Sequence, residues 1–555
     1  MDVAFLRQRD QQQELPRLEA CTDEPVRVVR HGVFLNPVSG IDSIQIFIGK
    51  ISVRFLHSAA PSAINPGAPT LKRSPEVQLS ARHYINGRWE TGVTSGLSIN
   101  PSDLRETVAE YARADRSQTE QAVRAAADAF RAWSMTTPQR RADALDQIGS
   151  EILARKDELG LLLAREEGKT LPEAVAEAAR AGQIFKFFAG EALRVGGETV
   201  ASLRPGVHVD ITREPVGVAG LITPWNFPLA IPAWKIAPAL ACGNAVVFKP
   251  SELVPACGWA LAEIIGRAAL PAGTFNLVMG SGREVGQALI EHPLVDALSF
   301  TGSAATGERV LQAAAGRRAK VQLEMGGKNP LVVLADADLE LAVDCAVQGA
   351  FFSTGQRCTA SSRLIVEARV HDAFVARLKQ RMAALKVGHA LEPGVDIGPV
   401  ADRAQLEENM AAIATAREEG AEHVYGGDLL QRPSEGHYMS PALFLAQPNH
   451  RIAREEIFGP VACVLRADDA EHALALANDT PFGLCAGICT NSLRHAMHFR
   501  RHARVGMTMV NLPTAGIDYH VPFGGRKASS YGAREQGRHA AEFYTTVKTG
   551  YMKAA

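Results

Sequence analysis

The sequence predicts an α/β protein built on parallel sheets, and three observations support this fold class. Short β-rich segments alternate with helical segments from about residue 216 to 324, and a second alternation occupies about residues 330–520. Glycine-containing turns follow several of the predicted strands and lead into helices. Such alternation indicates βαβ units, which form parallel sheets covered by helices. A length of 555 residues corresponds to about three or four structural units.

The composition is that of an ordinary globular protein. Hydrophobic residues make up 46% of the chain, and 59 Lys and Arg nearly balance 60 Asp and Glu. This balance removes the basic surface that nucleic-acid binding requires. The eight Cys form no CxxC pair, which argues against a disulfide scaffold and a zinc ribbon. We therefore expect a reducing, cytoplasmic setting with no metal and no nucleic-acid partner.

One uncharged segment, residues 215–234, is long enough to span a membrane. It contains four prolines, and each proline removes a helix hydrogen bond that lipid cannot replace. We predict a buried loop and strand instead, and no membrane partner. The N-terminus carries several acidic residues and no early apolar run, which argues against a signal or transit peptide.

Residues 1–81 differ in composition from the rest of the chain, with Gln and Arg at the start and Pro, Ser and Ala later. We expect a poorly ordered N-terminal extension. The alternating apolar residues of 44–55 leave a second possibility, a short hairpin. Regular structure is expected from Tyr84, because Asn86-Gly87 between apolar and aromatic residues predicts a β-hairpin.

Long helices are predicted next. Ser117 and Glu120 form a candidate capping box ahead of apolar residues at helical spacing, which predicts a helix beginning at Ser117. Helical periodicity continues over 139–167 and 172–193.

The β-rich and helical segments that follow carry the fold prediction. No 20–50-residue repeat interrupts them, which excludes solenoids and propellers. The predicted strands are 216–222, 245–248, 274–278, 297–300, 320–323, 331–334, 362–366, 461–465 and 486–489, and the predicted helices are 255–269, 286–291 and 307–315.

Three polar turns follow predicted strands. The segment 280–286 contains three glycines and opens a helix, although its spacing departs from GxGxxG by one residue. The segment 300–303 offers a hydroxyl and free N–H groups to a pyrophosphate. The segment 249–252 places a cation, a hydroxyl and a carboxylate at the strand edge where α/β sheets bind ligands. Ordinary tight turns and a solvated loop are the alternative interpretations.

Two residues are candidates for covalent chemistry. Cys358 lies in the polar, Gly-containing segment 353–359, and the neighbouring Arg357 would favour its thiolate, the reactive form. Six other cysteines are interpreted as inert core residues: Cys242, Cys257, Cys345, Cys463, Cys485 and Cys489. Glu324 ends an apolar strand before two glycines, and is either a general base or the partner of a salt bridge to Lys328.

Seven short motifs occur along the chain in a fixed order. They are Pro224–Pro228, Lys249–Glu252, Phe300–Ser303, Leu323–Lys328, Gly355–Cys358, Glu455–Pro460 and Pro522–Gly525. In these motifs the sequence resembles the aldehyde dehydrogenase superfamily, and the resemblance covers about residues 82–553. The activity described next is implied by that resemblance and not by composition or periodicity.

The resemblance implies a covalent mechanism on Cys358. Its thiolate would attack the aldehyde carbonyl, and the Asn226 amide and the Cys358 backbone N–H would stabilise the oxyanion. Hydride transfer to a nicotinamide would leave a thioester, and Glu324 would activate the water that hydrolyses it. Lys235 and Glu535 match residues that relay the proton outward. The carboxylate at Glu324 implies hydrolysis of the thioester rather than acyl transfer to coenzyme A.

NAD is the implied cofactor, with NADP as the alternative. A carboxylate at Glu252 would accept ribose hydroxyls and repel a 2′-phosphate, which favours NAD. The cofactor-binding residues implied by the resemblance are Thr223, Trp225, Lys249, Ser251, Glu252, Gly282, Gly286, Phe300, Gly302, Ser303, Gly326, Glu456 and Phe458.

The implied substrate is a small aldehyde. Residues 511–537 resemble enzymes of the superfamily that oxidise α-ketoglutarate semialdehyde (2,5-dioxopentanoate). Phe352 stands where succinate semialdehyde dehydrogenases have an arginine, which argues against that substrate. The alternatives are succinate semialdehyde, broad aldehyde specificity and, remotely, a catalytically silent nucleotide-binding relative.

A substrate with a carboxylate needs a cation in its binding tunnel, because an unpaired buried charge is costly. By analogy the tunnel is lined by three aromatic residues. Either Arg180 or Arg357 would meet the carboxylate, and the sequence does not choose between them. The aromatic residues are Phe227, Trp234 and Phe523.

The resemblance also implies the domain organisation: a doubly wound, Rossmann-like cofactor domain, an α/β catalytic domain and a bridging oligomerisation arm. A homodimer or homotetramer follows, because an exposed strand edge needs a partner. The expected bounds are 1–81 for the extension, 82–196 and 216–326 for the cofactor domain, 327–528 for the catalytic domain, and 197–215 and 529–555 for the arm.

Overall fold

A computed structural model describes residues 43–48, 51–56 and 79–554, and the chain divides into a short N-terminal unit and a large unit that begins at Val77. In the first unit, strands β1 (Ser43–Ile48) and β2 (Ile51–Leu56) pair antiparallel in continuous register. The alternating stretch therefore forms a hairpin. Most of the expected extension, residues 1–81, lies outside the described residues.

The large unit opens with five short strands. β4 (His83–Ile85) and β5 (Arg88–Glu90) form the predicted hairpin, with Asn86 and Gly87 at φ 51° and 76°, the left-handed conformation that the turn requires. β3 (Leu79–Ala81) pairs in parallel with β7 (Thr107–Arg113), and β7 pairs with β6 (Thr94–Ile99).

Four helices follow: α1 (Arg116–Ser134), α2 (Pro138–Ala154), α3 (Lys156–Glu167) and α4 (Leu171–Ala192). The predicted capping box is wrong, because the side chain of Asp115, not Ser117, accepts the hydrogen bond from the Gln118 N–H at 2.8 Å. The single helical pattern of 139–167 is two helices, since the backbone leaves helical geometry at Arg155.

The first sheet has eight strands in the order β22-β14-β13-β10-β11-β12-β4-β5. Its five central strands are parallel, as predicted. The strands not yet introduced are β10 (Val218–Ile222), β11 (Ala245–Lys249), β12 (Phe275–Leu277), β13 (Ala297–Thr301), β14 (Lys320–Glu324) and β22 (Ser530–Tyr531).

Helices cover both faces of this sheet. Alternate residues of β11 enter opposite cores, Val246 and Phe248 on one side and Ala245 and Val247 on the other. A parallel sheet buried on both faces needs such continuous apolar strands. The helices between its strands are α5 (Ala230–Ala241), α6 (Pro255–Arg267), α7 (Gln287–Glu291) and α8 (Ala304–Arg317), with a π-helical turn η1 (Gly282–Gly286) before α7.

The segment 215–234 is buried, but the prediction of loop and strand fails from Ala230, where α5 begins. Pro232 lies in the first turn of α5, where a missing N–H removes no intrahelical bond, so this proline does not prevent the helix. Among the residues that the structure describes, no helix is long and apolar enough to cross a bilayer.

The second sheet has seven strands in the order β17-β18-β19-β16-β15-β20-β21. Its strands are β15 (Pro330–Val333), β16 (Arg363–Glu367), β17 (Glu422–Tyr425), β18 (Ala442–Leu445), β19 (Val461–Ala467), β20 (Cys485–Cys489) and β21 (Met507–Val510). The surrounding helices are α9 (Leu339–Ala350), α10 (His371–Ala383), α11 (Arg403–Glu418), α12 (Arg451–Arg454), α13 (Ala470–Asn478) and α14 (Leu493–His502).

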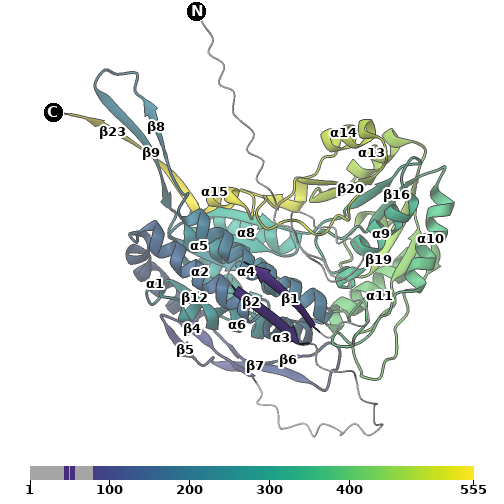
Figure 1. Cartoon of the computed structure of the whole chain (residues 1–555), viewed down its shortest axis with the longest axis horizontal. Coiled ribbons are helices and arrows are strands. Elements are labelled where there is room, and N and C mark those ends of the chain that lie inside the picture. The colour runs from purple at the N-terminus through teal and green to yellow at the C-terminus, as the bar shows by residue number, and fades with distance from the viewer. Residues whose placement is uncertain (1–42, 49–50, 57–78, 555) are drawn as a thin grey trace, which may run out of the picture. The chain divides into compact units, whose positions relative to one another are not determined.

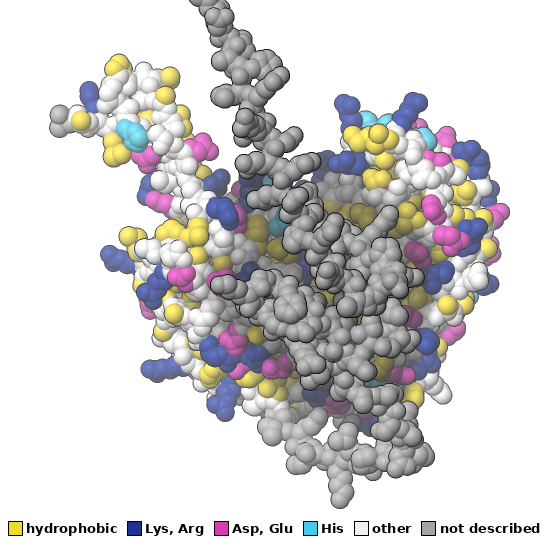
Figure 2. All heavy atoms as spheres, viewed as in Figure 1, with side chains coloured by type: hydrophobic (Ala, Val, Ile, Leu, Met, Phe, Trp, Pro, Cys, Tyr) yellow, Lys and Arg dark blue, Asp and Glu magenta, His cyan; other side chains and the backbone are white. Residues whose placement is uncertain are grey.

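A three-stranded sheet projects from the large unit as an arm (Figure 1). Its strands are β8 (Glu198–Ala201), β9 (Val207–Pro215) and β23 (Thr545–Lys553), and β9 lies in the middle. Apolar side chains are exposed on it, and Figure 2 shows hydrophobic side chains near its tip. The exposed apolar residues of the arm are Val200, Leu203, Val547, Tyr551 and Met552.

Candidate active site

The first sheet has a crevice where its strand order reverses. From β10 the chain proceeds to β11 and β12 on one side and then to β13 and β14 on the other. In open α/β sheets, ligands bind at the carboxyl ends of the strands at such a point. The buried hydroxyls of Thr223, after β10, and Thr301, at the end of β13, have no hydrogen-bond partner among the described residues. These polar atoms fit a dinucleotide.

The segment after β11 forms one side of the crevice. Lys249 is buried, which lowers its pKa to about 8, and its Nζ donates to the Pro250 carbonyl at 3.0 Å. Arg113 Nη2 and Tyr111 Oη both lie 3.4 Å from Glu252 Oε1. Sequence reasoning missed Arg113, since it lies in β7 with no motif around it.

The turn after β13 fits an anion. Ser303 caps α8 by accepting from the Thr306 N–H at 3.4 Å, and the N-terminus of α8, the end of a helix that attracts anions, follows directly on β13. A Cβ at Gly302 would lie 2.5 Å from the Phe300 ring, so no side chain fits there. In the η1 turn, by contrast, a Cβ at Gly282 would meet nothing within 4 Å.

Glu456 lies close enough to Cys358 to affect its thiol, and Phe458, two residues later, contacts Trp225. Glu456 accepts a hydrogen bond from the Gly327 N–H at 2.8 Å, and burial raises its pKa to about 7. A Cβ at Gly326 would lie 2.0 Å from Glu456 Oε2, so this contact requires glycine. The rings of Trp225 and Phe458 meet edge to face at 5.4 Å.

Cys358 lies in the loop between η2 (Phe352–Gly355) and β16. Its carbonyl accepts from Asn329 Nδ2 at 2.7 Å, which ties the loop to the segment after β14. Burial raises the pKa of the Cys358 thiol, and the carboxylates of Glu456 and Glu324 raise it further. The expectation that Arg357 favours the thiolate fails, because the Arg357 guanidinium is paired elsewhere.

Asn226 reaches the same loop from the other side. Its Nδ2 donates to the Gln356 carbonyl at 2.9 Å, two residues before Cys358. The backbone carbonyl of Asn226 accepts from Lys169 Nζ at 2.7 Å, and both residues are buried. The loop after β10 and the loop before β16 are therefore joined through this amide.

Glu324 ends β14 and is almost fully buried. Its Oε2 accepts a hydrogen bond from Ser530 Oγ at 2.6 Å, and Ser530 lies on the neighbouring strand β22. Burial, followed by the nearby Glu535 carboxylate, raises the pKa of Glu324 well above its usual value. The alternative salt bridge to Lys328 is wrong, since Lys328 Nζ has no partner among the described residues.

Lys235 and Glu535 form a buried pair beneath Glu324. Lys235 lies on α5, and its Nζ contacts Glu535 Oε1 and donates to Ser299 Oγ at 2.7 Å. Glu535 raises the pKa of Glu324, so the three side chains form one electrostatic cluster.

A cavity of about 460 Å³ opens at Cys358. Trp234 and Phe523 stack with ring centroids 5.3 Å apart on its wall. The predicted substrate residues that line it together with Cys358 are Phe227, Trp234, Phe523, Arg180 and Arg357.

The two arginines of this cavity differ in their partners. Arg357 Nη2 pairs with Glu173 Oε1 at 3.1 Å. Arg180 contacts the Ile517 carbonyl and lies 3.4 Å from Gln536 Oε1, both uncharged acceptors. Burial lowers the pKa of Arg180, and its Nε has no partner among the described residues. Of the two, only Arg180 has no ion pair among the described residues, and the carboxylates that act on its charge, Glu177 and Asp518, are not hydrogen-bonded to it.

Sequence reasoning missed the charges at the start of α4. Lys169 Nζ pairs with Glu177 Oε2 at 2.7 Å, and both side chains are buried. Glu177 Oε1 accepts from the Leu229 and Ala230 N–H groups at 3.0 and 3.2 Å, where α5 begins. The only sequence signal is a cluster of charges between two helices, which usually indicates a solvated surface.

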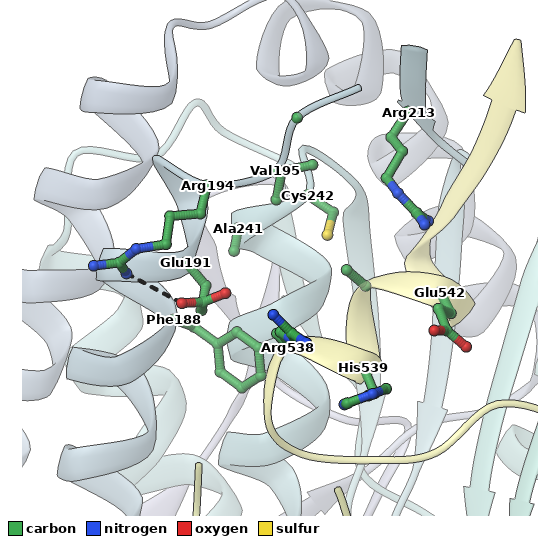
Figure 3. Close-up of a pocket in the computed structure, with 12 residues that line it drawn as sticks. Phe188, Glu191, Arg194, Val195, Arg213, Ala241, Cys242, Arg538, His539 and Glu542 are labelled. Atoms are coloured by element: carbon green, nitrogen blue, oxygen red, sulfur yellow. Dashed lines mark hydrogen bonds and ion pairs between the residues drawn. The ribbon is translucent and has the colours of Figure 1, made fainter. Parts of the chain in front are cut away.

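A second cavity of about 410 Å³ lies at the root of the arm (Figure 3). Glu191 and Arg194 of the α4 end pair there at 3.1 Å. None of the predicted site residues lines this cavity. Its lining includes Phe188, Glu191, Arg194, Arg213, Cys242, Arg538, His539 and Glu542.

Comparisons with known proteins agree with this arrangement. The model of the aldehyde dehydrogenase family matches residues 90–550. The chain is 41% identical over 477 residues to an alpha-ketoglutaric semialdehyde dehydrogenase of Bacillus subtilis (strain 168), covering 85% of this chain and 98% of the relative. It is 42% identical over 480 residues to an alpha-ketoglutarate semialdehyde dehydrogenase of Haloferax volcanii, with 85% and 98% covered.

A solved structure also resembles the chain. A betaine aldehyde dehydrogenase from Staphylococcus aureus, in complex with NAD+, matches with a TM-score of 0.84 and 34% identity, covering 86% of this chain and 95% of that chain.

Proposed function

The chain belongs to the aldehyde dehydrogenase family, and on that premise we propose that it oxidises α-ketoglutarate semialdehyde to α-ketoglutarate with NAD. The general reaction, NAD-dependent oxidation of a small aldehyde to a carboxylic acid, follows from the family. The observation that supports this particular substrate is Arg180, which lines the Cys358 cavity and has only uncharged acceptors.

Cys358 is the proposed nucleophile. Its sulfur attacks the carbonyl carbon and forms a thiohemiacetal, whose oxygen accepts hydrogen bonds from Asn226 Nδ2 and the Cys358 N–H. Asn226 Nδ2 already donates to the loop that carries Cys358, so little rearrangement brings it to the oxyanion. Bound NAD supplies the hydride acceptor, which leaves a thioester on Cys358.

Glu324 is the proposed base for hydrolysis of the thioester. A carboxylate with a raised pKa accepts a proton from water more readily than an ordinary glutamate. The Ser530 hydroxyl fixes its orientation, and Lys235 with Glu535 offers the exit route for the proton. After hydrolysis the acid leaves and Cys358 is free again.

Charge accounting within the cavity favours Arg180 as the carboxylate partner. Lys169 and Arg357 form ion pairs with Glu177 and Glu173, whereas Arg180 forms no ion pair among the described residues and is offset only by the more distant Glu177 and Asp518. A substrate carboxylate would therefore gain most from Arg180, whose Nε also lacks a partner among the described residues. A charged hydrogen bond of this kind contributes about 1.5–3 kcal/mol.

Betaine aldehyde is the second candidate. The stacked Trp234 and Phe523 rings present an aromatic wall of the type that binds quaternary ammonium groups. Arg180 in the same cavity would repel such a cation. Succinate semialdehyde is less favoured, because Phe352 packs on the core of the second sheet and is absent from the cavity lining.

The test is a comparison of kcat/KM for α-ketoglutarate semialdehyde, pentanal and betaine aldehyde. We expect the semialdehyde to be preferred, and Arg180→Gln to raise its KM by about 10–100-fold, the equivalent of the lost charged hydrogen bond, while pentanal is little affected. Arg180→Lys, which keeps the charge, should recover part of the loss. Preference for pentanal or betaine aldehyde would refute the substrate and leave the family unchanged.

For the cofactor, we infer NAD over NADP. Glu252 would accept the ribose hydroxyls, while the adjacent Arg113 moderates the repulsion of a 2′-phosphate. Some activity with NADP is therefore expected. Steady-state rates with each cofactor, for the natural chain and for Glu252→Gln, test the assignment; an unchanged NAD to NADP ratio in the variant would contradict it.

Assembly through the arm is a further part of the proposal. The exposed apolar side chains of β8, β9 and β23 need a partner surface, which favours a homodimer or homotetramer. Light scattering on the purified protein measures the state, and a monomer at micromolar concentration would contradict it. The cytoplasmic setting stays a prediction.

A further inference from the structure

The loop before Cys358 has an unusual backbone. Ser353, Thr354 and Gly355 are three consecutive residues in the left-handed region, at φ 50°, 57° and 64°. Gly355 must be glycine, because a Cβ there would lie 2.2 Å from the Gly459 carbonyl oxygen. Ser353 and Thr354 have no such freedom, and side-chain-bearing residues keep this conformation only where surrounding contacts impose it.

Thr354 donates through its Oγ1 to the Gly398 carbonyl at 3.2 Å, whereas Ser353 is held by Glu173. Its Oε1 accepts from the Ser353 N–H and from Ser353 Oγ, both at 2.9 Å. Its Oε2 accepts from Thr170 Oγ1 at 2.8 Å, and Thr170 is the N-cap residue of α4. The carboxylate thus joins the first turn of α4 to the strained residue of the nucleophile loop.

Glu173 Oε1, which accepts from Ser353, also binds Arg357. Arg357 Nη2 lies 3.1 Å from Glu173 Oε1 and 2.8 Å from Ser353 Oγ, and Nη1 lies 3.3 Å from the Gln348 carbonyl. A cation next to a thiol favours the thiolate unless a carboxylate compensates it. Arg357 is the residue before the nucleophile; Glu173 provides most of its compensation, and the more distant Glu167 adds to it.

We propose that Glu173 is a positioning residue that holds the nucleophile loop in its left-handed conformation and neutralises Arg357 beside Cys358. The inference rests on the proposed role of Cys358 as the nucleophile, and it adds a residue that controls the reactivity of that thiol. The Gln356 carbonyl of this loop accepts a hydrogen bond from Asn226 Nδ2. By holding the loop, Glu173 therefore also fixes the distance between the two proposed oxyanion donors, Asn226 Nδ2 and the Cys358 N–H. An unpaired Arg357 would make the resting thiol reactive before substrate binds.

The charged surroundings of Cys358 set the direction of the expected effect. Glu456, Glu324 and Glu535 raise the pKa of the thiol, in addition to burial. Lys169 and Arg180 of the α4 side line the same cavity, and Lys169 is paired with Glu177. Loss of the Glu173 charge would leave the positive charge of Arg357 without its ion-pair partner beside Cys358, so the pKa of the Cys358 thiol should fall.

The test is Glu173→Gln, which keeps an acceptor oxygen for Ser353 and removes the charge that pairs with Arg357. The rate of Cys358 alkylation by iodoacetamide is followed against pH by mass spectrometry of the peptide that contains it. We expect the pH midpoint to fall by about 1 unit, the lower end of the effect of a nearby charge. The double variant Glu173→Gln/Arg357→Gln should return the midpoint to that of the natural chain.

Kinetics supply a second readout. Glu173→Gln should lower kcat for pentanal several-fold with little change in KM, because the oxyanion donors are displaced and the binding walls are not. The matched control is Glu191→Gln, which breaks a similar pair with Arg194 at the far end of α4, in the cavity of Figure 3. This control should leave both the alkylation midpoint and kcat unchanged.

An unshifted midpoint in Glu173→Gln, or a shift that persists in the double variant, would overturn the proposal. A lower melting temperature with an unchanged midpoint and kcat would show a purely structural pair. Failure of the nucleophile assignment is distinguishable, since Cys358→Ala would then remain active and alkylation of Cys358 would not inactivate the enzyme.

Discussion

Two groups of charged side chains near Cys358 contrast with each other: one on α4, which lines the cavity, and one at the end of β14, which is not part of the cavity lining. We call them the α4 wall and the β14 wall. On the α4 wall each carboxylate has its own cation, Glu173 with Arg357 and Glu177 with Lys169. On the β14 wall, burial and then the neighbouring Glu535 carboxylate raise the pKa of Glu324. Compensated charges hold backbone in place, whereas a carboxylate near another carboxylate exchanges a proton readily. The contrast separates residues that position the site from residues that react in it.

Cys358→Ala removes the group that both walls serve, so it has the largest expected effect. Aldehyde oxidation should fall below detection, while NAD binding, measured by fluorescence titration, should stay near that of the natural chain because the cofactor residues lie on other segments. Normal turnover by the variant would show that Cys358 is not the nucleophile, and the two walls would then have no reacting group in common.

Glu324→Gln tests the reactive wall. The variant should still form the acyl-enzyme and release a burst of NADH, and steady-state turnover should fall by about 10²–10⁴-fold, the usual contribution of a general base. Rapid-mixing absorbance at the NADH band measures both phases. Absence of a burst would assign Glu324 to a step before hydride transfer.

Glu177→Gln tests the paired wall. It leaves the Lys169 charge buried without a full partner, which costs about 3–5 kcal/mol of unfolding free energy. Urea denaturation measures the loss. On this wall we expect stability to fall more than kcat in the protein that remains folded. A large fall in kcat with unchanged stability would show that Glu177 takes part in the reaction instead of positioning the site.

The pH dependence sharpens the difference further. The reactive forms are the thiolate of Cys358 and the carboxylate of Glu324, and both pKa values are raised in the free protein. Deprotonation therefore occurs at higher pH than for an ordinary glutamate or cysteine, and kcat/KM should rise from neutral into alkaline pH. A profile that falls over this range would contradict the assignment of these two groups.

Deletion of residues 1–78 has the smallest expected effect. The family match begins at residue 90, and the large unit begins at Val77. The truncated enzyme should keep its kcat and its melting temperature within experimental error. Loss of soluble protein would show that the β1–β2 hairpin packs on the rest of the molecule.

Much of the parallel sheet could be predicted from the sequence, because strands buried on both faces are continuous apolar runs that end at glycine or polar turns. The strands around Val246 and Leu331 are examples. The start of α5 could not be predicted. An apolar segment rich in proline has the same sequence pattern whether it forms a loop or a helix with proline in its first turn. The N-cap of α1 was predicted two residues too late, at Ser117 instead of Asp115, because both residue types are favoured at N-cap positions.

The site itself was predictable only where a motif carried it. Cys358, Glu324 and Asn226 were identified by resemblance; in the structure Glu324 acts electrostatically on the Cys358 thiol, and Asn226 donates to the loop that carries Cys358. The buried charges of 166–177 could not be identified in this way. Glu166 accepts from the Ala256 and Cys257 N–H groups at 2.7 Å each, at the start of α6, and nothing local distinguishes it from a solvated glutamate.

The order in which the chain is synthesised determines when this site becomes complete. Ser530, which orients Glu324, is 206 residues further along the chain, and Glu535, which contacts Lys235, is 300 residues further. A nascent chain that has emerged only as far as β21 therefore has its nucleophile and its cofactor crevice but no oriented base. Such long sequence separations slow folding, and activity should appear only after residue 535 has left the ribosome. Stalled chains ending before and after that residue, assayed for aldehyde oxidation once released, would show this step.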